Sequence, residues 1–186
     1  MKLALFPLPV FLLPGGKTRL RIFEPRYLRL VSQSLLHGNG FVICLCTIND
    51  EFYPIGSRVQ IYDFEKDEQG VLTIDVEAVD RVEIGAFTVQ SDGLKEAEIV
   101  ILPHWQTYKL PEKQQYMASR LRGYLTSHPL YSDNLKDQDF KNLTWVCQRW
   151  LELLPIDDSK KYWLAKQSDC SPCAEFIGEV IRHEVL

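Results

Sequence analysis

The sequence lacks three features that would point directly to a class of protein: an excess of positive charge, a long apolar run and a regular cysteine pattern. Its formal net charge is −4, which argues against nucleic acid as the main partner, because binding a phosphate backbone needs a basic surface. No apolar run approaches the roughly 20 residues of a membrane-spanning helix. The five cysteines form no even disulfide framework and are typical of a reducing cytoplasm, which we expect as the location.

Motifs of catalysis and metal binding are also missing. Gly16-Lys17-Thr18 matches the end of a phosphate-binding loop, but that motif needs a glycine where this chain has Phe11. The residues that follow predict a strand rather than a helix whose N-terminus binds phosphate. The four histidines are scattered and have no Asp or Glu at metal-ligand spacing. The sequence therefore predicts no catalytic residue, no bound cofactor and no metal site.

The first forty residues carry the densest set of structural signals. Prolines interrupt the apolar opening, residues 3–14, so it cannot form a helix and predicts short extended pieces. Arginines alternate with apolar residues over 19–22, which predicts a half-buried strand. A helical period begins after Glu24, with proline at the first helical position and Gly38 to end the helix.

Closely spaced strands are predicted from residue 41 to residue 102. The clearest is Leu72 to Ala78, where apolar and polar residues alternate. The predicted strands are 41–48, 52–64, 72–78, 81–89 and 97–102, with polar turns at 67–70 and 91–93. About six strands with one early helix indicate a small, mostly antiparallel, barrel-like sheet.

The pattern changes after Pro103. From Pro111 onward the apolar residues recur at helical spacing and predict several helices, one of them capped by Asp157 or Asp158. The sequence therefore predicts an α+β fold. We expect a β-rich part over residues 1–103 and a helical bundle over residues 104–186.

Two motifs near the start of the chain identify a family. The stretch F-P-L-P-x-x-x-L-P-G begins at Phe6 and is followed by L-R-I-F-E-P-R-Y, which ends at Tyr27. Together they resemble the opening of the Lon protease N-terminal, substrate-binding domain, and the resemblance runs from about Leu3 to Ile181. The chain departs from the family pattern V-x-G-x-x-R at Ala78, where the family usually has glycine, so we expect a local difference in the backbone.

The resemblance implies a β part similar to a PUA-type pseudo-barrel and a module that binds proteins without catalysing a reaction. The implied partners are unfolded or exposed apolar protein segments, with a protease or chaperone as a further partner in proteolysis or quality control. Full-length Lon proteases carry an ATPase domain and a Ser–Lys peptidase domain after this region. We expect neither in a chain that ends at Leu186, and we expect no nucleic acid and no membrane as a partner.

Two rival hypotheses come from other classes. Cys170-Ser171-Pro172-Cys173 stands at a predicted helix start, where a thiol pKa is lowered, so the two cysteines are candidates for a thiol redox pair. They are also candidates for half of a zinc site with Cys147 and His183, although no second C-x-x-C exists. The other rival is an RNA-binding protein, and it is based only on analogy with the PUA-like fold.

Candidate partner-binding residues are aromatic. Trp105 and Tyr108 follow the predicted junction between the two parts, and such junctions form clefts that aromatic anchors line. Tyr131 stands in a polar loop, where it is either a contact residue or a lid on the helical bundle. A further pair, Glu24 and Arg26, is expected to be an ion pair that fixes the first helix against the sheet.

The first testable prediction is the absence of catalysis. The purified protein is expected neither to hydrolyse ATP nor to cleave unfolded casein, because Phe11 stands where the phosphate-binding loop needs glycine. Phosphate release and gel analysis of casein check this expectation. ATP turnover that survives repurification and disappears in Lys17→Ala would contradict it.

Overall fold

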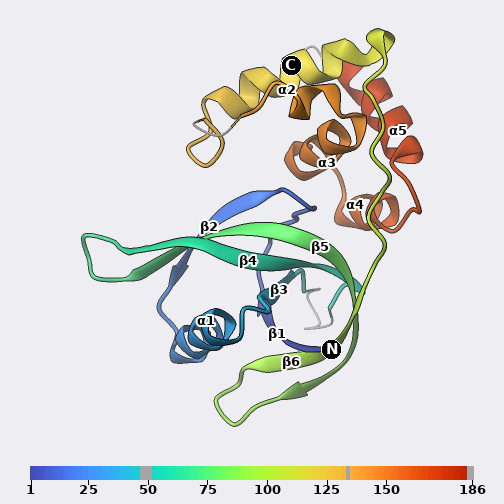
Figure 1. Cartoon of the computed structure of the whole chain (residues 1–186). Coiled ribbons are helices and arrows are strands. Elements are labelled where there is room, and N and C mark those ends of the chain that lie inside the picture. The colour runs from blue at the N-terminus through green and yellow to red at the C-terminus, as the bar shows by residue number, and fades with distance from the viewer. Residues whose placement is uncertain (47–51, 133–134, 184–186) are drawn as a thin grey trace. The chain divides into compact units, whose positions relative to one another are not determined.

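A computed structural model shows two compact units, Met1–Leu102 and Pro103–Leu186 (Figure 1). The structure describes residues 1–46, 52–132 and 135–183, and the side chains of these residues up to position 182. The first unit is built from strands around one helix, and the second is built from helices. The predicted α+β class is confirmed.

In the described ranges, the sheet of the β unit consists of six strands. They are β1 (Lys2–Pro7), β2 (Lys17–Ile22), β3 (Phe41–Cys44), β4 (Ile55–Lys66), β5 (Leu72–Val89) and β6 (Lys95–Ile101). Their order is β2-β5-β4-β3-β1-β6, and an additional pairing joins β5 to β6. The β1–β3 pair is parallel and the other pairs are antiparallel. The strand predicted over 41–48 ends at Cys44, and its residues 47 and 48 lie outside the described residues.

Strand β5 corrects the prediction of two separate strands over 72–78 and 81–89. It is one strand of 18 residues, and irregularities in its ladders let it bend. Against β4, Arg58 pairs with Asp80 and Val59 with Ala78, so Val79 is an extra residue. Such bulges bend a strand and increase its twist. The bent strand pairs with β2 and β4 at its start and with β6 at its end, which closes the sheet.

The core of the β unit lies on both faces of β1. Phe6 belongs to a cluster that includes Ile22, Leu30 and Ile74, between the sheet and α1 (Pro25–His37). Leu5 belongs to a second cluster formed mainly by β1, β3, β5 and β6. Because successive side chains of a strand point to opposite faces, a strand with both faces covered is apolar throughout. This accounts for the apolar residues from Leu3 to Phe6 in β1.

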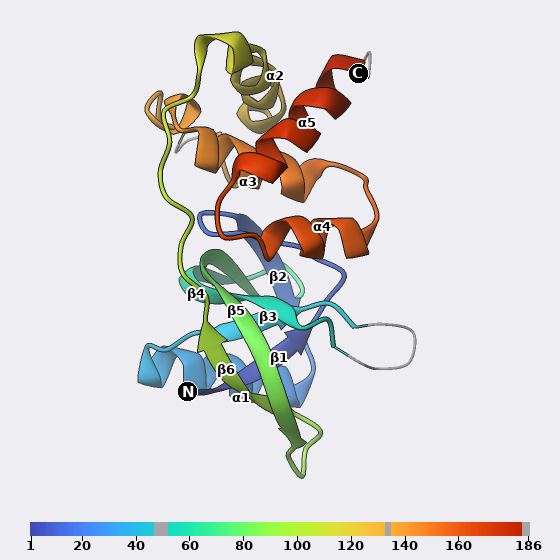
Figure 2. The ribbon, with the colours of Figure 1, turned by 90° about the vertical axis from the view of Figure 1, so that its right-hand side faces the viewer.

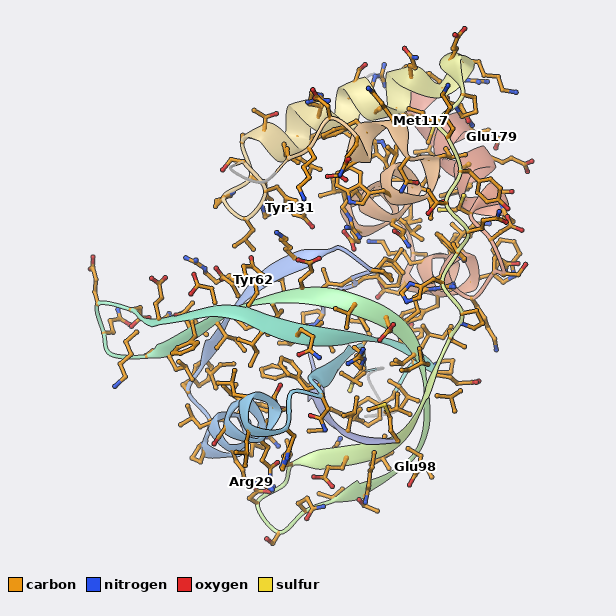
Figure 3. The ribbon with its side chains drawn as sticks, viewed as in Figure 1. Arg29, Tyr62, Glu98, Met117, Tyr131 and Glu179 are labelled. Carbon is orange, nitrogen blue, oxygen red and sulfur yellow. The ribbon has the colours of Figure 1, made fainter. Side chains whose placement is uncertain are left out.

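Helix α1 has the predicted boundaries. Pro25 occupies the first helical position, and Gly38 ends the helix in the left-handed conformation, with φ of 66°. Leu30 and Val31 face the core. On the outer side, Arg29 makes two hydrogen bonds of 2.7 Å to Asp92 in the β5–β6 turn (Figure 3). The helix is therefore anchored to the sheet by apolar packing and by an exposed ion pair.

At Ala78 the chain differs from the family pattern without disturbing the sheet. Ala78 is buried in the core next to α1. Its N–H donates to the carbonyl of Gly16 at 2.8 Å, and its carbonyl accepts from the N–H of Gly15 at 2.7 Å. A methyl group therefore fits where the family usually has glycine, and the extra residue follows immediately, at Val79.

The described part of the helical unit contains the α-helices α2 (Gln115–Thr126), α3 (Leu143–Leu153), α4 (Asp158–Ala165) and α5 (Ser171–His183) (Figure 2). Trp150 on α3 is buried, and its Nε1 donates to the carbonyl of Met117 on α2 at 2.9 Å. Asp157 caps α4 by accepting from the N–H of Ser159 at 2.8 Å. None of the helices in the described ranges is both long and apolar enough to cross a membrane.

The second prediction concerns a mostly buried ion pair. Arg58 Nε donates to Asp80 at 2.6 Å across the β4–β5 ladder, next to the bulge, and little of either side chain is exposed. Asp80→Ala is expected to lower the free energy of unfolding by about 3 kcal/mol, because it leaves the guanidinium buried without this carboxylate. Urea denaturation measures the loss.

The matched control is Glu65→Ala in the same unit. Glu65 pairs with Arg19 at 3.2 Å, but both side chains are half exposed or more, and such pairs contribute little to stability. An Asp80→Ala loss no larger than that of Glu65→Ala would show that the ladder does not depend on the buried pair.

Candidate functional site

A pocket of about 560 Å³ opens in the β unit. Its walls come from the end of β1 (residues 5–8), the middle of β2 (19–21) and the segment 23–27, with Gly93 and Lys95 at the β5–β6 hairpin. The F-P-L-P and F-E-P-R-Y motifs therefore lie side by side in space and both contribute to the same pocket. Its volume is within the ordinary range of ligand pockets, about 300–1,000 Å³.

Aromatic rings form much of the apolar wall. The rings of Phe6 and Tyr27 are stacked, with centroids 4.1 Å apart. Burial raises the pKa of Tyr27 above its ordinary value, which fits a phenol next to an apolar floor. Phe23 is different, because 71% of it is exposed although it lines the pocket. An exposed ring at a pocket rim is available to a ligand.

Arg26 supplies a charge to the same pocket. Its Nη2 lies 2.8 Å from Glu24, its Nη1 lies 3.4 Å from the carbonyl of Gly93, and its guanidinium lies 4.7 Å from the centroid of the Tyr27 ring. Its Nε is buried without a hydrogen-bond partner among the described residues. A guanidinium has five N–H donors, so Arg26 has donors left for a ligand.

The Glu24–Arg26 pair is less important to the fold than expected. It forms as predicted, but it joins two residues of one turn, and the side chains of Arg26 and Glu24 are 34% and 44% exposed. The link from α1 to the sheet is made instead by Arg26 with Gly93 and by Arg29 with Asp92. Because exposed pairs contribute about 0–1 kcal/mol, removing Arg26 costs little stability through this pair.

The aromatic residues predicted to bind partners lie apart from this pocket. Trp105 is buried, and its Nε1 donates to the carbonyl of Gln167 within the helical unit at 2.7 Å. Tyr131 is buried as well, with its ring edge-on to that of His128 (Figure 3). Tyr108 is exposed. A role of these three residues in partner binding stays a prediction.

Cys170 and Cys173 are buried with Cys147 inside the helical unit. The thiol of Cys173 donates to the carbonyl of Cys147 at 3.9 Å, and Cys170 Sγ lies 3.4 Å from Thr144 Oγ1. A hydrogen bond with Cys147, together with burial, raises the pKa of Cys170. A redox cysteine needs an accessible thiolate, so this environment does not favour the redox hypothesis.

The zinc hypothesis gains no support from the same cluster. No group of three or more His, Cys, Asp or Glu side chains in the described ranges is arranged to hold a metal ion. The side chain of His183, proposed as a ligand, lies outside the described residues. The three cysteines belong to the apolar interior of α3 and α5, where free cysteine acts as a small apolar side chain.

The chain folds into a strand-built unit, with a pocket at its F-E-P-R-Y segment, and a helical unit that follows it. This arrangement defines the class as a two-part α+β domain. Comparisons with known proteins identify the family. The chain belongs to the family of the ATP-dependent protease La (LON) substrate-binding domain, whose model matches residues 2–171. The resemblance seen in the sequence is confirmed.

Similar proteins agree with this assignment. A Lon N-terminal domain protein from Xanthomonas campestris has 27% sequence identity and a TM-score of 0.78, covering 96% of this chain and 98% of that one. The N-terminal domain of a Mycobacterium avium complex Lon protease has a TM-score of 0.64 at 12% identity over the full length of both chains, which shows a shared fold. Cereblon from Gallus gallus is 29% identical over 98 residues, 50% of this chain and 22% of that protein. The chain therefore spans about a fifth of that relative's length.

Phe23 is the pocket residue that sequence reasoning did not select. It stood inside a motif used only to recognise the family. The exposure of Phe23 could have been predicted from the alternation of buried and exposed residues in β2. Leu20 and Ile22 are buried there, and Arg19 and Arg21 are not. Continuing that period places position 23 on the exposed side.

The third prediction concerns the buried thiols. One fast-reacting thiol per folded chain is expected with Ellman's reagent, from Cys46, because the other four cysteines are buried. All five are expected to react after unfolding in guanidinium chloride. Two fast-reacting thiols that disappear in a Cys170→Ser, Cys173→Ser double variant would restore the redox hypothesis.

Proposed function

We propose that the chain is a non-catalytic module that binds exposed apolar segments of other proteins at the pocket of the β unit. The single observation that carries this proposal is the exposed Phe23 ring beside a pocket with the apolar residues Phe6, Leu8 and Tyr27. Membership of the LON substrate-binding domain family supports the same class of ligand. The module serves as an adaptor that brings such segments to a protease or a chaperone.

The physical argument begins with the size and shape of the pocket. About 560 Å³ accommodates one or two bulky side chains but not a folded surface. When an aromatic ring of a ligand enters such a site, apolar surface of both that ring and Phe23 is removed from water. Rigid aromatic anchors of this kind commonly contribute most of the binding energy of an interface. The site therefore fits segments that are apolar and unfolded.

The chemistry of the pocket supports binding rather than catalysis. Its described lining contains one carboxylate, Glu24, and no histidine, cysteine or serine. Glu24 is paired with Arg26. None of the five cysteines forms a disulfide, and we infer a reducing, cytoplasmic location from the odd number and irregular spacing of the cysteines.

The fourth prediction tests the pocket directly. Phe23→Ala is expected to weaken binding of fluorescein-labelled, unfolded casein by about tenfold, because an aromatic anchor contributes more than about 1 kcal/mol. Fluorescence anisotropy at a fixed salt concentration measures the dissociation constant. Thermal unfolding is expected to be nearly unchanged, since most of the ring is exposed.

Phe64→Ala is the matched control. Phe64 lies on β4 and is 61% exposed, but it is not part of the pocket. If both variants weaken casein binding equally, general surface hydrophobicity explains the binding and the pocket does not. If binding is lost only on changing Tyr108, the ligand site lies in the helical unit and the proposal is wrong.

A further inference from the structure

The helical unit has a cleft of its own, of about 490 Å³. One wall is a face of α2, whose residues line the cleft at the spacing of successive helical turns: Gln115, Ala118, Ser119 and Arg122. From 115 to 122 the helix rises about 10 Å, which gives the length of this wall. The other wall comes from residues 109–110, before the 3₁₀-helix η1 (Glu112–Gln114), and from residues 137, 140 and 141 around the 3₁₀-helix η2 (Asp139–Lys141).

Backbone contacts hold the second wall together. The N–H of Leu110 donates to the carbonyl of Lys141 at 2.8 Å. Next to this bond, Lys109 and Asn142 form an isolated antiparallel bridge. The two chain segments that carry the lysines are therefore fixed against each other, and the cleft lies between them and α2.

The buried part of the lining is apolar. Leu110, Ala118 and Phe140 all line the cleft, and each is less than 9% exposed. Apolar walls have a low dielectric constant, and charges of one sign along such walls focus the electric field into a cleft. The sign of the charged side chains therefore determines which ligand the cleft attracts.

One cation of the lining is already compensated. Arg122 Nη2 donates to Asp137 at 2.9 Å, and its guanidinium lies 4.0 Å from the centroid of the Phe140 ring. This ion pair adds no net charge to the cleft. The carboxylates of Glu112 and Asp139 belong to η1 and η2 but are not part of the lining. The net charge of the cleft is therefore decided by its two lysines.

Lys109 and Lys141 carry this net charge. Both residues are exposed, and neither side chain forms an ion pair or a hydrogen bond with any residue in the part of the chain that the structure describes. The lining thus has a formal charge of +2, on a chain whose net charge is −4. Each ammonium group stands on a flexible four-carbon stem, so it can reach an anion that lies in the cleft.

We propose that this cleft binds a short acidic segment of a partner protein. Carboxylates of the segment face Lys109 and Lys141, and its chain lies along α2, where about three extended residues fit the length of the wall. An adaptor needs a surface for its protease or chaperone besides the pocket that binds the client, and the cleft supplies that surface in the helical unit. This inference goes beyond the proposed function and does not depend on the pocket of the β unit.

A nucleic acid fits the cleft less well. Binding a phosphate backbone usually neutralises several phosphates along an extended basic surface. The cleft offers only Lys109 and Lys141 as uncompensated cations, over a wall of about 10 Å. Two carboxylates of a flexible segment match that number of charges.

The test uses fluorescein-labelled peptides of about ten residues, long enough to cross the cleft. In the first peptide glutamate alternates with serine, and in the second glutamine replaces each glutamate. Neither contains an apolar residue that suits the pocket of the β unit. Fluorescence anisotropy at low salt is expected to show that the glutamate peptide binds about tenfold more tightly, because only its charges complement the lysines. Equal affinity of the two peptides would overturn the proposal.

The double variant Lys109→Gln, Lys141→Gln locates the charge. It is expected to weaken binding of the glutamate peptide about tenfold, since it removes both uncompensated cations. The matched control is Lys113→Gln, Lys136→Gln, which changes the net charge equally at two exposed lysines outside the lining. The control is expected to have little effect. Equal losses in the two variants would show that net charge, rather than the cleft, attracts the peptide.

NMR spectra of the full chain give a second readout. A saturating concentration of the glutamate peptide is expected to shift the backbone amide signals of Leu110, Ser119 and Lys141, which line the cleft. The signals of Phe23 and Lys95, which line the pocket of the β unit, are expected to stay in place. Shifts confined to Phe23 and Lys95 would place the peptide in that pocket and overturn the proposal.

Two competitors test the class of ligand. Inorganic phosphate and a single-stranded oligonucleotide are each titrated against the bound glutamate peptide at the same ionic strength. Weak competition by both is expected. If phosphate displaces the peptide at a concentration equal to that of the peptide, the cleft binds a free anion and the proposal is wrong. If the oligonucleotide binds more tightly than the peptide and responds to Lys109→Gln, Lys141→Gln, the partner is a nucleic acid and the proposal is wrong.

The outcomes separate this inference from the proposed function. If the double variant Lys109→Gln, Lys141→Gln weakens peptide binding but Phe23→Ala leaves casein binding unchanged, the cleft is confirmed and the client pocket is wrong. If Phe23→Ala weakens casein binding but the lysine variant leaves peptide binding unchanged, the client pocket stands and the cleft proposal is wrong.

Discussion

Strand β5 forms backbone hydrogen bonds with β2 and β4 at its start and with β4 and β6 at its end. The extra residue Val79 and the register shift after Ile84 interrupt the regular ladders and allow the strand to bend. At its end β5 pairs with β6 and closes the sheet there, while β2 remains at an edge. Residues of β2 line the pocket of the β unit.

The position of the pocket follows from this arrangement. The turn from β2 into α1 contributes to this pocket, and Phe23, Glu24 and Arg26 are among its lining residues. Pro25 starts the helix at once and leaves no room for a longer loop. The apolar side chains of α1 pack in one cluster with Phe6, and this packing holds the segment in place. An exposed aromatic side chain is thus placed on a rigid support, which reduces the entropy lost when a ligand is bound.

The helical unit shows how burial decides the role of a chemically versatile residue. Cys170 and Cys173 have the spacing of a redox pair, and Cys170 stands just before α5. Packing against α3 removes both from solvent, and a hydrogen bond with Cys147, together with burial, raises the pKa of Cys170. Trp105 provides a similar case, because its indole N–H is bonded to Gln167 inside the same unit. In both cases the residue type suggested chemistry or binding, whereas the surroundings indicate packing.

The sequence by itself determined the local structure of this protein. Pro25 and Gly38 define α1, Asp157 caps α4, and the period of two over Leu72 to Ala78 indicates a strand. These features depend on dihedral preferences and on side chains within a few residues of each other. The family could also be identified from the sequence, because each of its motifs is a contiguous stretch of residues.

Only the tertiary structure decided that the predicted strands over 72–78 and 81–89 are one, that β2 keeps a vacant edge, and that Phe23 stands beside the pocket. These features depend on pairing between segments that are well separated in sequence, such as Arg58 with Asp80, Arg19 with Asp75 and Leu5 with Lys95. Hydrophobic alternation specifies which face of a strand is buried, but it does not specify the neighbour along each edge.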